Sequence, residues 1–304
     1  MYAFIHIEKT AGSTLTTILR RSFGTRHCDI RLPLAKRRLG ERDWRPCVDA
    51  DDLQRARRLY PGLSCIAGHN VKPYGGLGTS GHDIRFFTFM RDPAARYVSQ
   101  YLNRARVYTR EAFDSWVSSR WTHNWQTKKI AGVPEADLAI AIIRQRVEFI
   151  GLTERFDESL VLLGQWLAGP GFKGEYRRVN QLKEKRRPRD VERERTDTSY
   201  LDTDHARQRI AEANAEDQKL YDYVVTQSYP RQVEAYPGDL AVDIRHLQVR
   251  NRSAGRLYEP LWPAFYRNCV YKPLVRFGVP SVDLSTTGAT SWESGRPQGG
   301  PDCD

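Results

Sequence analysis

The chain has 304 residues, of which 40% are hydrophobic and 28% are charged. This composition supplies enough apolar side chains for a sizeable core, which excludes a wholly disordered chain. The length predicts two average domains or one large α/β domain with an appendage. Lys and Arg total 48 against 37 Asp and Glu, which gives a net charge of +11. The excess favours anionic partners, such as nucleotides, phosphate or sulfate esters, acidic glycans, nucleic acid or anionic lipid, although a basic surface that serves only solubility fits as well.

The cysteines and the N-terminal residues indicate the compartment. The five cysteines are odd in number and include no C-x-x-C pair, which argues against a disulfide scaffold, although one bridge such as Cys28–Cys47 stays open. The first apolar run ends at Ile7 and is followed at once by Glu8 and Lys9, which is unlike a signal peptide. No stretch approaches the roughly 20 apolar residues of a membrane span. We therefore expect a soluble, cytoplasmic protein.

The chain opens with a short apolar run, residues 2–7, that is typical of a buried strand. A small polar turn follows, and then Leu15, Ile18, Leu19 and Phe23 recur at helical spacing. Strand, tight loop and helix in this order form the opening unit of a nucleotide-binding α/β domain.

Later segments continue the alternation of strands and helices. We expect strands at residues 63–67 and 84–90, and helices at 94–103, 136–148, 156–168 and 210–227. The pattern predicts an α/β fold, a P-loop-like three-layer domain with a central, mostly parallel sheet flanked by helices. We expect this domain to span residues 1–230, an extension to follow at 231–280, and the Ser-, Thr-, Gly- and Pro-rich residues 281–304 to form a disordered tail.

The first candidate site is the loop after the opening strand, which consists of Lys9, Thr10, Ala11, Gly12, Ser13 and Thr14. Backbone N–H groups at a helix N-terminus bind anions, Gly12 allows the backbone to approach a phosphate, and Lys9 adds a positive charge. The loop is not the standard P-loop, because its lysine precedes the glycine, and no acidic residue at a strand end is placed to hold magnesium. The alternative is that Gly-Ser-Thr only caps the helix.

The second candidate site combines Arg91 and Ser99. Arg91 follows the strand expected at 84–90, at the sheet edge where ligands of α/β proteins bind. Ser99 lies two helical turns further on, on a face that can turn back toward the strand end. A guanidinium and a hydroxyl together would hold a second phosphate, whereas Arg91 alone would more simply form a salt bridge with Asp92 or another acid.

The third candidate is His69, in the sequence Gly-His-Asn that follows the strand expected at 63–67. A histidine at a strand end can act as the base that removes a proton from an attacking hydroxyl. The alternative is a histidine whose nitrogens bond only to the backbone. His6, inside the opening strand, is expected to be structural.

Several segments in order resemble the sulfotransferase superfamily that uses 3′-phosphoadenosine 5′-phosphosulfate (PAPS), and most of all the carbohydrate branch related to heparan sulfate 2-O-sulfotransferase. The resemblance covers residues 1–230. The similar segments are FIHIEKTAGSTL (4–15), GHNVKPYGGL (68–77), RFFTFMRDPAARYVSQYL (85–102), HNWQTKKIAG (123–132), IGLTERFDESLVLL (150–163) and KLYDYV (219–224).

This resemblance implies a reaction and a role for each candidate. PAPS would place its 5′-phosphosulfate in the loop at 9–14 and its 3′-phosphate on Arg91 and Ser99. His69 would deprotonate the acceptor hydroxyl, which attacks sulfur in line, and Lys9 would stabilise charge on the bridging oxygen. The mechanism implies no metal. Glu8 stands where family loops carry proline or a neutral residue, so its carboxylate must point away from the phosphosulfate.

The acceptor implied by the resemblance is a hydroxyl of a saccharide or glycoconjugate, and the basic segments at 20–58 and 183–195 suit an acidic saccharide. A glycolipid, a small alcohol and a protein tyrosine stay open as alternatives. Within 123–132, Asn124, Gln126 and Lys128 are candidates for lining an acceptor cleft, and the equal alternative is a solvated helix start. Residues 180–188 are either a flap over the nucleotide or a solvated charge run.

Two other function classes stay open at this point. The first is a phosphotransferase or nucleotide kinase with an atypical phosphate loop. The second is a non-catalytic basic protein that binds nucleic acid or an anionic membrane through residues 255–279, where aromatic and basic residues alternate. No recognised nucleic-acid motif is present, so we expect no specific nucleic acid partner, and peripheral membrane contact would use 255–279. The alternative for that segment is an ordinary packed extension.

Overall fold

The computed structural model describes residues 1–33, 46–105, 108–167, 171–176, 198–253 and 260–277. Within these residues, five strands form one sheet in the order β2-β3-β1-β4-β5, and every neighbouring pair is parallel. The strands are β1 (Tyr2–Ile5), β2 (His27–Asp29), β3 (Cys65–Gly68), β4 (Arg85–Met90) and β5 (Val147–Leu152). The predicted α/β fold with a central parallel sheet is confirmed.

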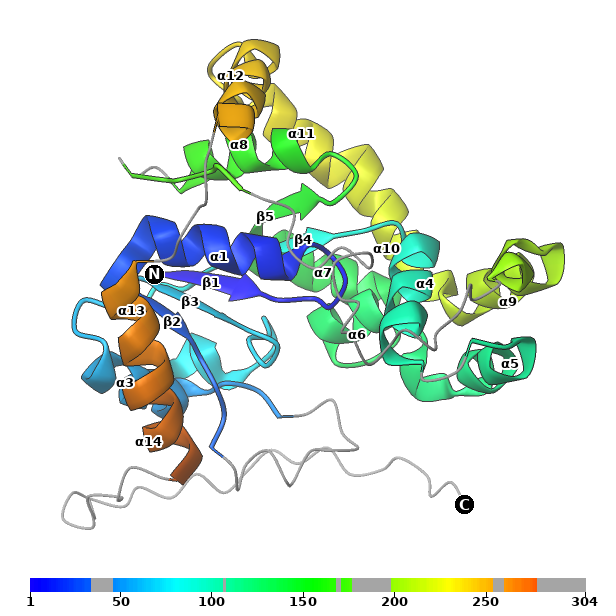
Figure 1. Cartoon of the computed structure of the whole chain (residues 1–304), viewed down its shortest axis with the longest axis horizontal. Helices are drawn as coiled ribbons and strands as arrows, with labels where there is room; N and C mark the ends of the chain where they lie inside the picture. Colours follow the sequence, from blue (N-terminus) through cyan, green and yellow to red (C-terminus); the bar gives the residue numbers. More distant parts are fainter. Residues whose placement is uncertain (34–45, 106–107, 168–170, 177–197, 254–259, 278–304) are drawn as a thin grey trace.

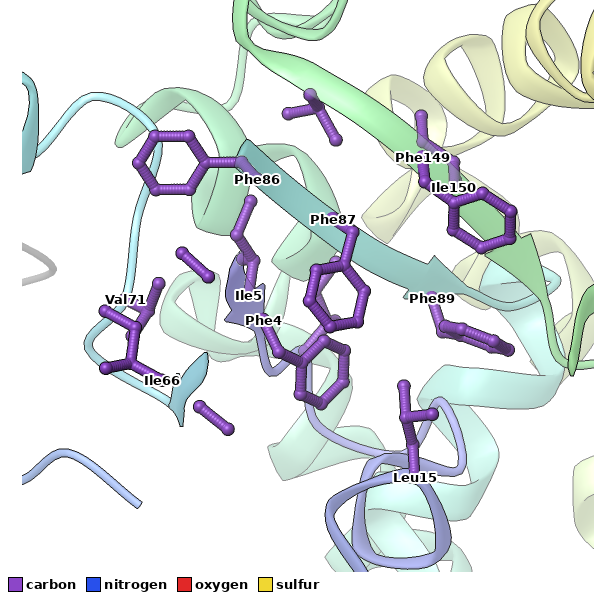
Figure 2. Packing of buried hydrophobic residues seen from close by; sticks show 14 of the residues in the cluster. Phe4, Ile5, Leu15, Ile66, Val71, Phe86, Phe87, Phe89, Phe149 and Ile150 are labelled. Atoms are coloured by element: carbon purple, nitrogen blue, oxygen red, sulfur yellow. The ribbon is translucent and has the colours of Figure 1, made fainter. Parts of the chain in front are cut away.

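The three central strands are buried because their side chains are apolar on both faces. Phe4 of β1 and Phe87 of β4 are fully buried, and their ring centroids lie 5.2 Å apart. Figure 2 shows these two rings side by side, with Leu15 of the first helix and Phe89 close to them. Each such side chain contributes about 1.5–3 kcal/mol of burial free energy, so this core holds the strands in one register.

Helices cover both faces of the sheet, as expected for parallel strands joined by crossovers. Figure 1 shows α1 and α8 on one side and α3, α6 and α7 on the other. The helices up to residue 166 are α1 (Gly12–Phe23), α3 (Ala50–Leu59), α4 (Pro93–Arg104), α5 (Arg110–Ser118), α6 (Trp125–Ala131), α7 (Ala136–Arg146) and α8 (Phe156–Trp166). Short 3₁₀ turns lie at η1 (Gly24–Arg26), η2 (Gly76–Thr79) and η3 (Arg120–Thr122).

A second, smaller apolar cluster joins α4, α5 and α9 beside the sheet. The elements that follow residue 197 are η5 (Ser199–Asp202), α9 (Asp204–Ala213), α10 (Ala215–Tyr223), the π-helical η6 (Val224–Ser228), α11 (Tyr229–Glu234) and α12 (Leu240–Ser253). The single helix predicted at 210–227 is wrong, because α9 ends at Ala213 and Asn214 separates it from α10. The side chain of Asn214 donates to the Ile210 carbonyl, at 2.8 Å, in place of a helical hydrogen bond.

The helix predicted at 136–148 is also too long, because its last two residues belong to β5. Val147 pairs with Phe86 and Leu152 pairs with Met90. The chain passes from α7 into β5 without an intervening turn, so no turn residue marked the boundary in the sequence.

The described part of the C-terminal segment is mostly helical and packs against the edge strand β2. It consists of α13 (Leu261–Phe265), the π-helical η7 (Tyr266–Tyr271) and α14 (Lys272–Phe277). Arg267 lies 3.5 Å from Asp29, and the Tyr271 hydroxyl accepts from the Arg31 backbone N–H at 3.1 Å. The packed-extension alternative therefore holds for this part, whereas Leu261, Trp262 and Phe265 are exposed and are the side chains that a membrane contact would use.

The remaining expectations concern a disulfide, a membrane span and three segments of the chain. The thiols of Cys28 and Cys47 are not joined to each other. No helix within the described ranges has both the length and the apolar character needed to cross a bilayer. The expected flap at 180–188, the charged stretch at 183–195 and the tail at 281–304 lie outside the described residues.

Candidate active site

The three candidate loops follow β1, β3 and β4, and the structure brings them together at one edge of the sheet. Ile5 at the end of β1 is paired with Gly68 of β3 and Thr88 of β4. The Arg91 guanidinium donates from Nη1 to the Lys9 carbonyl at 3.2 Å, which joins the second candidate site to the first. The carboxyl ends of parallel strands form the usual ligand edge of such a sheet.

The loop at 9–14 turns into α1 without a side-chain cap. Ala11 is the N-cap residue, and it has no side-chain acceptor for the first-turn N–H groups. Lys9 and Ala11 both have positive φ, 70° and 61°, a conformation that costs energy for residues other than glycine. The structure thus differs from the simple capping alternative, because Gly12, Ser13 and Thr14 lie inside the first turn and the N-cap residue Ala11 makes no side-chain hydrogen bond to the positive end of α1.

The side chains of this loop have separate environments. The Thr10 hydroxyl is buried and donates to the Ile7 carbonyl at 3.0 Å, so it stabilises the loop itself. Ser13 is exposed on the first turn, whereas Thr14 is buried. His6 leaves no space for a side chain at residue 12, because a Cβ on Gly12 would lie 2.1 Å from Nε2 of His6.

Arg91 is held by a buried amide from α6. Gln126 accepts from the Arg91 N–H at 3.0 Å and donates to the Arg91 carbonyl at 2.8 Å. This paired contact fixes the backbone at the end of β4. The Arg91 side chain is 30% exposed, and its Nε lies 4.0 Å from a carboxylate oxygen of Glu154. Arg91 and Ser99 line the same cavity, of about 770 Å³, between α4, η5, α9 and α10. The two residues expected to share a phosphate therefore face a common space large enough for part of a nucleotide.

His69 is half exposed, and its Nδ1 has two oxygen neighbours. It lies 3.2 Å from the His6 carbonyl and 3.1 Å from Oε1 of Glu8. Both oxygens are acceptors, so Nδ1 carries the proton and Nε2 of the neutral ring has the unprotonated lone pair. This tautomer is the one that a base acting through Nε2 requires.

His6 belongs to the site, although the sequence indicated only a structural role. Its ring packs against that of His69, with centroids 4.1 Å apart and the ring planes tilted by 32°, and it fills the space beside Gly12. Burial, assisted by His69, lowers the pKa of His6 to about 3. His6 is therefore neutral at physiological pH and separates the loop at 9–14 from His69.

The lowered pKa of His6 makes the fold sensitive to acid. The unfolded chain binds a proton at His6 below pH ~6.5, and the folded chain does not until about pH 3, so the free energy of unfolding falls as the pH drops through this window. At pH 5 the loss is about 2 kcal/mol. In His6→Asn we expect the drop between pH 7 and pH 5, measured by urea unfolding, to be smaller by about this amount. An unchanged drop would contradict the buried, neutral state of His6.

Glu8 contacts α6 and His69. Its carboxylate lies 3.1 Å from the Lys129 ammonium and 2.6 Å from the Trp125 indole nitrogen, which donates to it. Neither partner belongs to the loop at 9–14. The sequence showed Glu8 only as a departure from its family. Its contacts with Trp125 and Lys129, more than a hundred residues away, could not be read from the sequence.

The three candidates for the acceptor cleft begin α6 and are largely engaged inside the protein. Asn124 accepts from the Glu216 and Asp217 N–H groups, at 3.0 and 3.2 Å. Gln126 holds Arg91, and the Lys128 ammonium donates to the Arg120 carbonyl at 3.0 Å. The segment is the start of a helix, as the alternative prediction stated, but this helix is buried and not solvated.

Across the residues that the structure describes, no group of three or more His, Cys, Asp or Glu side chains is placed to hold a metal ion.

The comparison with protein families decides the class. A model of the sulfotransferase family matches residues 2–224. The chain belongs to this family. The match begins in β1 and ends at the start of η6, so it includes all three loops of the site. A search of curated proteins found no match.

The predicted membership in the sulfotransferases is thus confirmed. As a member, this sulfotransferase transfers sulfuryl groups to a hydroxyl-bearing acceptor. Family membership favours this activity over the kinase and over the non-catalytic binder.

Proposed function

We propose that this sulfotransferase moves the sulfuryl group of PAPS to a hydroxyl of a saccharide or glycoconjugate, without a metal and with His69 as the base. One observation carries the proposal. The start of α1, the Arg91 guanidinium and the His69 ring lie at the same edge of the sheet, linked through Lys9 and His6. Two anion sites beside one base match a donor with two phosphate positions and an acceptor that must lose a proton.

The donor substrate fits the residues present. The first-turn N–H groups of α1, the Ser13 hydroxyl and the Lys9 ammonium would hold its 5′-phosphosulfate. Arg91 and Ser99 would hold its 3′-phosphate at the mouth of the cavity that they share. Bound in this way, the donor supplies an electrophilic sulfur and a stable leaving group.

The residues then divide the chemistry between them. His69 Nε2 takes the proton of the acceptor hydroxyl while the acceptor oxygen bonds to sulfur. The bond between sulfur and the bridging oxygen breaks, and its electron pair stays on that oxygen as adenosine 3′,5′-bisphosphate leaves. Lys9 stabilises this developing charge, so catalysis depends on positioning and electrostatics.

The saccharide acceptor is supported by an aromatic surface connected to His69. Trp121 is 43% exposed, and its ring lies 5.8 Å from that of Trp125, which bonds to Glu8. The guanidinium of exposed Arg104 lies 5.3 Å from the Trp121 ring. An indole face with a cation beside it suits the apolar face of a sugar ring that carries an acidic group.

The role of Arg91 leads to a selective effect on binding. We expect Arg91→Ala to weaken binding of adenosine 3′,5′-bisphosphate by about 10- to 100-fold, because a charge-assisted hydrogen bond contributes about 1.5–3 kcal/mol. The dissociation constant of AMP, which lacks the 3′-phosphate, should change by less than about threefold. Calorimetric titration of both nucleotides measures the difference. Arg245→Ala, on the exposed side of α12, is the control. Equal losses for both nucleotides would show that Arg91 only supports the Lys9 backbone.

The proposal as a whole is tested first by three separate titrations of the protein: adenosine 3′,5′-bisphosphate and AMP with chelator present, and ATP–magnesium without chelator. Preferential binding of the bisphosphate supports the donor assignment and directs work to a screen of acceptors. Preference for ATP–magnesium would favour a phosphotransferase and overturn the donor assignment. Binding of none of them would contradict the proposed anion sites.

A further inference from the structure

Glu8 lies behind the proposed base and is surrounded by donors. Oε1 is 3.1 Å from His69 Nδ1 and also 3.1 Å from Lys129 Nζ, and Oε2 accepts from Trp125 Nε1 at 2.6 Å. Only 21% of the Glu8 side chain and 5% of the Lys129 side chain are exposed. Figure 1 shows α6, which carries Trp125 and Lys129, beside the loop that follows β1. A carboxylate at residue 8 therefore has three donors from two separate parts of the chain.

This environment keeps the carboxylate ionised. Burial alone would raise the pKa of Glu8, but the Lys129 ammonium and the hydrogen bonds from His69 and Trp125 outweigh it and hold this pKa well below its usual range. His6, which directly follows β1, and Arg96, on α4, also act on this cluster. A carboxylate held in this way keeps its charge during turnover and is not itself the proton acceptor.

We propose that Glu8 is a positioning residue for His69: it holds the Nδ1–H so that Nε2 faces the acceptor, and it stabilises the positive charge that the ring gains when Nε2 takes the proton. The inference rests on the proposed role of His69 as the base. A carboxylate behind a histidine is an arrangement that directs a base and stabilises its protonated form in other enzymes. Glu8 therefore acts through His69 and does not touch the reacting atoms.

Lys129 has a second part in the arrangement. Its ammonium donates to the His69 carbonyl at 2.9 Å as well as pairing with Glu8. It thus fixes both the backbone of the loop after β3 and the carboxylate behind the ring. Without a partner, the buried ammonium would be strongly destabilising, so a simple ion pair is the competing explanation for Glu8.

The two explanations differ in what Glu8→Gln changes. Glutamine keeps the size and an acceptor oxygen but removes the charge. If Glu8 positions the base, kcat with PAPS and a desulfated heparan oligosaccharide falls about 10- to 100-fold, while KM for PAPS and the affinity for adenosine 3′,5′-bisphosphate stay within about twofold. Glu8→Asp should recover part of kcat. If the ion pair with Lys129 only stabilises the fold, Glu8→Gln should lower the free energy of unfolding and leave kcat of the folded fraction unchanged.

A spectroscopic readout decides the matter even if that saccharide is not turned over. In the native protein we expect the Nδ1–H proton of His69, assigned by its loss in His69→Gln, to resonate far downfield because a carboxylate accepts from it. In Glu8→Gln this resonance should move upfield. Glu148→Gln is the control, since Glu148 lies at the start of β5, away from the carboxyl ends of the strands.

An Nδ1–H resonance that is the same in Glu8→Gln and in the native protein would overturn the proposal. If Glu8→Gln does not fold, the double variant with Lys129→Met removes both buried charges and is measured in its place. Failure of the donor assignment is a separate result, because it appears as absent bisphosphate binding by the native protein, whatever the resonance shows.

Discussion

His69→Ala is expected to reduce sulfuryl transfer by about 10²- to 10⁴-fold while leaving the affinity for adenosine 3′,5′-bisphosphate within about twofold of the native value. The acceptor hydroxyl must lose its proton as it attacks, and His69 presents Nε2 for this purpose, with Nδ1 directed toward Glu8 and the His6 carbonyl. The side chain of His69 is 52% exposed, so its removal should affect the core little. Turnover and calorimetric binding, measured on the same preparation, provide the two values.

Two further variants sharpen this test. His69→Gln keeps a donor toward Glu8 but has no group that takes up a proton at neutral pH, so it should be as inactive as His69→Ala. His246→Ala, on the exposed surface of α12, is the control and should retain full activity. Activity that survives in both His69 variants would assign the base elsewhere, and loss of nucleotide binding in both would assign His69 to the donor site instead.

Lys9→Met should have the second large effect, a fall in kcat of about 10²- to 10³-fold. Methionine keeps the length of the stem and removes the charge, and the backbone of residue 9 keeps its positive φ in either case. The charge on the bridging oxygen develops only as the bond to sulfur breaks, so Lys9 should contribute more to the transition state than to binding of the donor. We expect KM for PAPS to rise less than tenfold, in the range of a single exposed charge contact.

Lys173→Met provides the comparison for Lys9, because Lys173 is exposed and its backbone N–H bonds to Ser22 at the far end of α1. It should behave as the native protein does. A raised KM with unchanged kcat in Lys9→Met would mean that Lys9 binds the donor equally in its ground and transition states, and the proposed stabilisation of the leaving oxygen would then be wrong.

The parts of the fold that the sequence predicted are those with a strong local pattern. Continuous apolar runs marked β1, β3 and β4, and Pro93 marked the start of α4. β2 was missed because it has only three residues, and β5 because it follows α7 directly. These two strands are defined by their pairing with neighbours, which is a tertiary property.

In the site, too, the residues with a local sequence signal were predicted, and those defined by tertiary contacts were not. Lys9, Arg91 and His69 were predicted because each follows an apolar strand, and parallel strands end at one edge. Gln126 was expected to face an acceptor, but its amide holds the Arg91 backbone from 35 residues away. The contacts of His6 depend likewise on how the loops fold over one another, for which residue spacing has no signal.

The C-terminal helices have a consequence for the sheet that they border. β2 is an edge strand, and an uncovered edge offers its N–H and C=O groups to strands of other molecules, which is a common origin of aggregation. Tyr271 accepts from the Arg31 N–H just beyond β2, and Arg267 lies against Asp29 within it. Residues 261–277 lie outside the segment that the family shares. We expect them to protect the sheet from intermolecular pairing, so that a chain shortened before Leu261 loses solubility before it loses its active site.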